Sequence, residues 1–190
     1  MDRTALKPDI CVYPKDDPQD GCKTDFSKMA FFIEFKSDKS YDPFVDKGEM
    51  VDDDFPFEKS SIESQHNRGQ LASYAAALAG TQFRVHTFCV LVCAGHARFI
   101  RWDRSGAIVT ELFDCAKNPQ FFAEFFWRFD RLNPEEKGHD TSVSPVPENV
   151  PQDILKNLRE RISAAEPILE ESRDSPAEPG KTSEESKCQR

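Results

Sequence analysis

Three charged residues near the beginning of the chain have types and spacing that could hold a metal ion. Asp9 opens one apolar segment, and Glu34 and Lys36 lie two residues apart at the end of another. Two neighbouring carboxylates repel each other unless a cation or a proton lies between them, and Mg²⁺ accepts one or two carboxylates together with waters. A lysine beside the ion could orient or deprotonate an attacking water. We therefore expect Asp9 and Glu34 as catalytic metal ligands, Lys36 as their catalytic partner, and Mg²⁺ as the cofactor.

Two predicted strands must position these residues. The segments DICVY (9–13) and KMAFFIEFK (28–36) are rich in the apolar and aromatic residues that strands favour. Successive side chains of a strand point to opposite faces, so Phe35 is expected to fill the core on the face away from Glu34. If the two strands are neighbours, Asp9 and Glu34 meet at one end of the sheet. The face that carries Glu34 is expected to open there, rather than into a dry core.

A helix is predicted to follow over residues 60–79. Ser60 and Glu63 have the S-x-x-E spacing of a capping box, and Gly80 is expected to end the helix. The acidic segment between this helix and the second strand (37–57) reads as irregular.

Gln70 and Tyr74 lie four residues apart, on one face of that helix. Together with Asp9 and with Glu34-x-Lys36, this arrangement resembles the PD-(D/E)xK nucleases, and the Gln–Tyr pair resembles a feature of their RecB-like branch. The resemblance implies a nuclease-like core and Gln70 as a further catalytic residue. A helix and a strand usually precede the Asp in that superfamily, so an incomplete core or a truncated chain is expected here. A structural ion pair between Glu34 and Lys36 is the alternative.

The remaining elements predict the fold class. The segment FRVHTFCVLVCAG (83–95) is apolar on both faces and reads as a central strand. Residues 96–114 form a hairpin around the turn at 103–106, and a Phe-rich helix at 118–132 begins with an Asn cap and a proline. This order predicts an α/β fold on the border with α+β, with a mixed central sheet and flanking helices.

Composition divides the chain near residue 133. Of its 190 residues, 38% are hydrophobic and 16 are Phe, but residues 134–190 hold no Phe, Tyr or Trp. We therefore expect a folded module at 1–133 and a mostly disordered tail at 134–190, with one short amphipathic helix at 151–166. The net charge of −9 argues against a protein that coats nucleic acid by bulk electrostatics.

A second resemblance rests on the segment RGQLASYAAALAG and its continuation through FRVHTFCVLVCAG to ELFD, followed by FFWRF and GHDTSV. With KPDI and FFIEFKSD before them, these motifs resemble the region upstream of the kinase lobe in the fungal-type protein kinase family, over residues 7–143. The resemblance implies an intracellular fungal protein, cytoplasmic or nuclear. The chain lacks the G-x-G-x-x-G loop, the H-R-D motif and the D-F-G motif, so no ATP site and no phosphoryl transfer are expected.

Three functions remain open: a regulatory module of that family with a nuclease-like fold, an active Mg²⁺-dependent nuclease, and an interaction module that docks a partner. The expected partners are nucleic acid or protein, and no segment is apolar enough to predict a membrane span. Arg98, Arg101 and Arg104 could touch phosphate, but on a hairpin we expect them to solvate an edge or to pair with Asp103.

Overall fold

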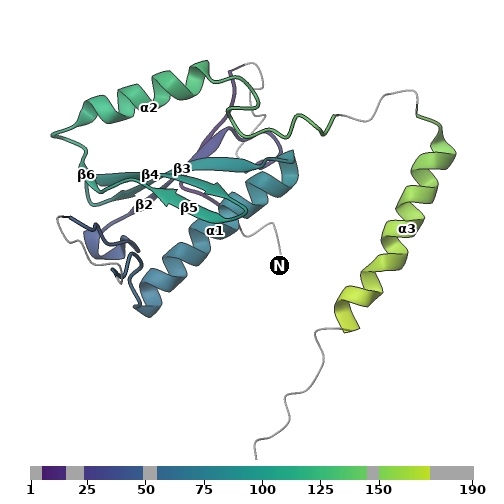
Figure 1. The fold of residues 1–190 in the computed structure, drawn as a ribbon, viewed down its shortest axis with the longest axis horizontal. Helices are drawn as coiled ribbons and strands as arrows, with labels where there is room; N and C mark the ends of the chain where they lie inside the picture. The colour runs from purple at the N-terminus through teal and green to yellow at the C-terminus, as the bar shows by residue number, and fades with distance from the viewer. Residues whose placement is uncertain (1–5, 16–23, 49–54, 145–149, 172–190) are drawn as a thin grey trace, which may run out of the picture. The chain divides into compact units, whose positions relative to one another are not determined.

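A computed structural model of the chain describes residues 6–15, 24–48, 55–144 and 150–171 (Figure 1). Six strands and three helices follow one another, besides a short 3-10 turn at Lys39–Tyr41: β1 Ile10–Val12, β2 Phe31–Lys36, α1 Ile62–Gln82, β3 His86–Cys93, β4 His96–Asp103, β5 Gly106–Val109, β6 Phe113–Asp114, α2 Pro119–Arg131 and α3 Gln152–Glu171. Parts of the predicted acidic segment and of the predicted disordered tail, at 49–54, 145–149 and 172–190, lie outside the described residues.

The six strands form one mixed sheet in the order β1-β2-β3-β4-β5, with β6 also paired to β4. β2 and β3 are parallel and are joined through α1, whereas the other neighbouring strands are antiparallel. β3 has a partner on each side and is the central strand, as its apolar sequence predicts. The predicted mixed sheet with flanking helices is confirmed, and with one parallel pair it belongs to the α+β class.

The helix α1 covers one face of the sheet (Figure 1). Its residues Leu71, Tyr74 and Leu78 are buried against Phe32 of β2 and against β3. The limits of the helix differ from the prediction. Ser61, and not Ser60, is the cap, because its hydroxyl accepts a hydrogen bond from the Ser64 amide at 3.2 Å.

The helix α1 also continues past the glycine that was expected to end it. Gly80 lies inside the helix, which ends where Phe83 takes a left-handed backbone conformation with φ of 52°. Phe83 is followed by Arg84, whose guanidinium donates hydrogen bonds to the carbonyls of Met29 and Ala30, just before β2.

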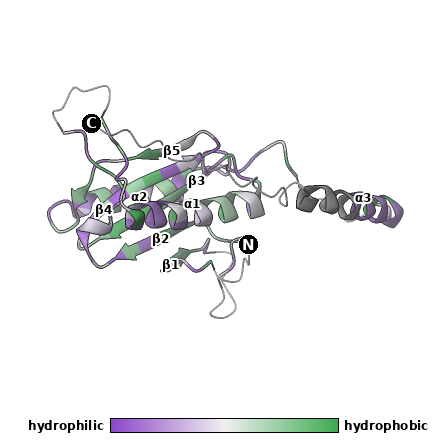
Figure 2. Cartoon of the chain, turned by 90° about the horizontal axis from the view of Figure 1, so that it is seen from below, coloured by the Kyte–Doolittle hydropathy of each residue, from purple (hydrophilic) through white to green (hydrophobic). Residues whose placement is uncertain are grey.

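The helix α2 covers the opposite face, as its Phe-rich sequence predicts (Figure 1). Phe125 stacks on Phe99 of β4 with ring centroids 4.5 Å apart, and Phe129 contacts Phe31 of β2 edge-on at 4.8 Å. Aromatic pairs in these geometries add stability beyond the area that they bury. The hydropathy colouring shows green, hydrophobic stretches along the strands (Figure 2).

Two side chains of the sheet differ from their predicted surroundings. Phe35, expected in the core, is 47% exposed, and the apolar cluster that contains the α2 phenylalanines includes Ile33 but not Phe35. Arg98, expected at a solvated edge, is 1% exposed. Its guanidinium forms an ion pair with Asp42 at 2.8 Å and a second one with Asp46, so it fastens the loop after β2 to the sheet. Arg101 does pair with Asp103, at 2.8 Å.

Residues beyond α2 return to the start of β3. The Val85 amide donates to the carbonyl of Gly138 at 2.8 Å, and His86 Nε2 lies 3.0 Å from the carbonyl of Glu136. Gly138 has φ of 97°, and a Cβ placed there would lie 2.0 Å from the carbonyl oxygen of His86. A glycine is therefore required at this crossing. As a result, the compact unit extends to Val143, ten residues beyond the change in composition.

The second unit begins at Ser144 and contains α3, which runs five residues further than the predicted helix. In its described part, Ile154 and Leu158 are about half exposed, at 49% and 50%. None of the helices in the described parts of the chain is long and apolar enough to cross a lipid bilayer.

Candidate functional site

The structure brings Asp9 to the end of β2 that carries Glu34. β1 and β2 pair antiparallel with Ile10 opposite Ile33, a register that sets Asp9 opposite Glu34. The carboxylate of Asp9 accepts a hydrogen bond from the Phe35 amide at 2.8 Å. The two carboxylates predicted to meet at this end of the sheet are therefore neighbours across the β1–β2 pair.

Lys36 links the strand to the helix. Its Nζ donates to Glu34 Oε1 at 2.9 Å and to Gln70 Oε1 at 2.7 Å. An ammonium group has three N–H donors, so one of them remains beyond these two bonds. The Lys36 side chain is 16% exposed, which leaves Nζ near the surface of the site.

The hydrogen-bonded chain continues from Gln70 into the segment before β1. Gln70 Nε2 donates to the Tyr74 hydroxyl at 2.9 Å, and that hydroxyl donates to the carbonyl of Lys7 at 3.0 Å. Gln70 and Tyr74 meet because residues four apart share a face of α1. One network therefore joins the N-terminal segment, β2 and α1.

Glu34 is the buried member of the network, at 3% exposure. Burial raises the pKa of its carboxyl, the hydrogen bond and charge of Lys36 lower it, and the charge of Asp9 raises it again. Among the described residues, Glu34 Oε2 has no hydrogen-bond partner. The expectation that this face opens into solvent is therefore wrong for Glu34 itself, because its side chain is buried.

The predicted site residues Asp9, Glu34, Lys36 and Gln70 thus lie together, although their catalytic roles stay predictions. The carbonyl of Lys7 was not foreseen as a member of the network. A backbone acceptor carries no sequence pattern, and only the position of the Tyr74 hydroxyl reveals it.

Mg²⁺ fits the donor set here only in part. The buried Oε2 of Glu34, which has no partner within the described segments, and the neighbouring carboxylate of Asp9 are the kind of oxygen ligand that this ion prefers. Within the residues that the structure describes, no group of three or more His, Cys, Asp or Glu side chains could hold a metal ion. Waters would have to supply the remaining ligands.

Comparison with known proteins identifies the family. A model of the family described as Fungal protein kinase matches residues 7–173, which is most of the chain. The chain therefore belongs to the fungal protein kinase family, as its motifs predict. Neither a curated protein nor a solved structure matches it.

Proposed function

We propose that this chain is a regulatory or interaction module of the fungal protein kinase family, with a nuclease-like fold and no catalytic activity of its own. The observation that carries the proposal is the position of Lys36 Nζ, held between Glu34 Oε1 at 2.9 Å and Gln70 Oε1 at 2.7 Å. Two of the three donors of the lysine that a nuclease would need beside its water are thus engaged with side chains. The network then serves to fasten α1 and the N-terminal segment to the sheet.

The sequence supports the absence of kinase chemistry. Phosphoryl transfer requires a phosphate-cradling loop, a catalytic Asp and a metal-holding Asp, and the chain lacks the motifs that supply them. Membership of the family therefore does not imply that this chain catalyses phosphoryl transfer.

The partly exposed aromatic side chains of α2 support an interaction role. Phe121 and Phe126 are each 40% exposed, and Trp127 is 57% exposed. The guanidinium of Arg131 lies 4.1 Å from the centre of the Trp127 ring. Exposed aromatic side chains next to an arginine are the composition that protein interfaces favour.

The proposal is tested with the purified full chain in two assays. Calorimetry with ATP and Mg²⁺ should show no heat of binding, and a plasmid and a single-stranded oligonucleotide incubated with Mg²⁺ or Mn²⁺ should stay intact. A micromolar dissociation constant for ATP, or cleavage that disappears in both Glu34→Gln and Lys36→Met but persists in Glu124→Gln on α2, would overturn it.

A Mg²⁺-dependent nuclease is the second candidate, and one observation favours it. Glu34 Oε2 is buried without a partner among the described residues, which is costly unless a proton or a cation satisfies it. In this candidate Asp9 and Glu34 would hold Mg²⁺, which would activate a water for attack on a phosphate. Lys36 would orient that water, and Gln70 would keep Lys36 in place.

Metal titration separates the two candidates independently of cleavage. For a nuclease site, added Mn²⁺ should raise the unfolding temperature of the wild type and not that of Glu34→Gln. For the structural network, Mn²⁺ should change neither protein.

A further inference from the structure

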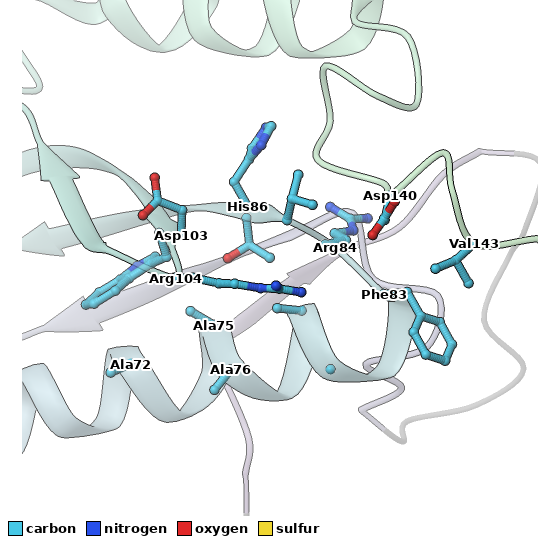
Figure 3. Close-up of a pocket in the computed structure, with 15 residues that line it drawn as sticks. Ala72, Ala75, Ala76, Phe83, Arg84, His86, Asp103, Arg104, Asp140 and Val143 are labelled. Carbon is cyan, nitrogen blue, oxygen red and sulfur yellow. The ribbon is translucent and has the colours of Figure 1, made fainter.

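A cavity of about 540 Å³ lies between α1 and the end of the sheet where β3 begins and β4 ends (Figure 3). Its floor is apolar, because α1 contributes Ala72, Ala75, Ala76 and Ala79, and the ring of Trp102 forms part of the wall. Volumes of 300–1,000 Å³ with apolar linings and a few polar groups are typical of small-molecule sites. The cavity shares no residue with the Glu34–Lys36 network.

The cavity contains the guanidinium of Arg104. Arg104 lies across the alanine face of α1 (Figure 3). Within the described parts of the chain, no hydrogen bond or ion pair of its side chain is found. Arg104 is an exposed residue, so its guanidinium over the apolar floor is accessible to an anion that enters the cavity from solvent.

The two carboxylates of the cavity are engaged elsewhere. Asp103 bonds Arg101 at 2.8 Å, and Asp140 accepts from the hydroxyl and the amide of Ser142 at 2.6 and 2.9 Å. The bonds from Ser142 are the main reason why the pKa of Asp140 is lowered, and the charge of Arg104 adds to the effect. Neither carboxylate therefore neutralises Arg104 by direct contact.

Arg84 brings a second positive charge to the lining of the cavity, beside that of Arg104. Arg84 is 7% exposed and lines the cavity, and its donors go to Gln82 and to the carbonyls of Met29, Ala30 and Lys137. Burial lowers the pKa of Arg84 to about 10, so the side chain stays charged at neutral pH. Carbonyl oxygens satisfy its donors without cancelling its charge, so Arg84 adds a positive charge to the lining of the cavity.

We propose that this cavity binds a small apolar molecule that carries one carboxylate or sulfonate group. The apolar body lies on the alanine floor and against Trp102, and the anionic group meets Arg104 with the charge of Arg84 behind it. This assignment goes beyond the proposed function and does not depend on it, because a module without catalytic activity or a nuclease could equally carry the site.

Three probes with the same apolar body and different charges test the proposal: 2-naphthoate, 2-naphthalenemethanol and 2-naphthylmethylamine. The full chain with Trp127→Phe is used, because the chain has two Trp and this change leaves Trp102, on the cavity wall, as the sole fluorescence reporter. The carboxylate should bind about tenfold more tightly than the alcohol, which corresponds to ~1.4 kcal/mol, and the amine should bind most weakly.

Three variants locate the binding. Arg104→Gln should weaken the carboxylate to the affinity of the alcohol while leaving the alcohol unchanged. Ala76→Leu, which fills the cavity from an exposed helix position with little change in helix propensity, should abolish binding of all three probes. Arg128→Gln on α2 makes the same charge change outside the cavity and should have no effect.

Several results would overturn the assignment. These are an amine that binds as tightly as the carboxylate, a carboxylate preference that survives Arg104→Gln, binding that survives Ala76→Leu, or no binding of any probe with a dissociation constant below ~1 mM.

Discussion

Replacing Lys36 by Met tests whether the network at the end of β2 is structural. The change removes the two hydrogen bonds of Nζ, at 2.9 and 2.7 Å, and leaves the Glu34 carboxylate buried without a charge partner. Breaking a buried pair by removing one partner costs about 3–5 kcal/mol. Because the Lys36 side chain is 16% exposed and water can approach, we expect a cost just below this range, about 2–3 kcal/mol.

The pH dependence of this loss has a definite sign. Lys36 lowers the pKa of Glu34 against the larger, raising effect of burial, so its removal raises that pKa further. When the pKa of a carboxyl is higher in the folded protein than in the unfolded chain, the folded protein loses stability as pH rises from the unfolded-state pKa to the folded-state pKa. The deficit of Lys36→Met should therefore be smaller at about pH 4.5, near the unfolded glutamate pKa, than at about pH 7.5.

Equilibrium unfolding in urea, followed by circular dichroism at both pH values, measures the deficit. The double variant Lys36→Met with Glu34→Gln should recover about 1–2 kcal/mol, because it removes the stranded charge. A Lys36→Met protein within about 0.5 kcal/mol of wild type at both pH values, or one with a larger deficit in acid, would refute the reasoning.

Three further changes probe other parts of the fold by the same unfolding measurement. Arg98→Met should cost about 3–5 kcal/mol because it strands the buried carboxylate of Asp42, whereas Arg101→Met on the same strand should cost under about 1 kcal/mol; equal losses would contradict this account of burial. Thr87→Val should raise stability by about 1 kcal/mol, since the buried Thr87 hydroxyl has no partner among the described residues; a loss of stability would show that the hydroxyl is bonded. Tyr74→Phe removes two hydrogen bonds and should cost about 1–3 kcal/mol, and a neutral result would mean that the network holds nothing in place.

The sequence was sufficient where a pattern is local. The apolar run of β3 predicts a central strand, and the spacing of Phe residues in α2 predicts the face that covers the sheet. The meeting of Asp9, Glu34, Lys36 and Gln70 could also be expected, because strand alternation and helix periodicity each fix one face.

Other features could not be predicted because they depend on distant partners or on a balance between neighbours. Ser60 and Ser61 are both acceptable caps, and only the contact of Ser61 with the Ser64 amide decides between them. The burial of Arg98 depends on Asp42, which lies 56 positions away in the chain. Alternation alone could place Arg98 on the α1 face but could not supply its counter-charge.

The crossing at Gly138 has a consequence for how this chain can be divided. A fragment cut where the aromatic residues end, at residue 133, would lose three backbone carbonyls. These are hydrogen-bonded to the Val85 amide, to the His86 ring and to the Arg84 guanidinium. The fragment would leave a buried guanidinium short of an acceptor and uncover the beginning of the central strand. For expression, for crystallisation or for fusion to another domain, the boundary therefore belongs after Val143, and the polar, proline-containing stretch before it should be kept as part of the folded body.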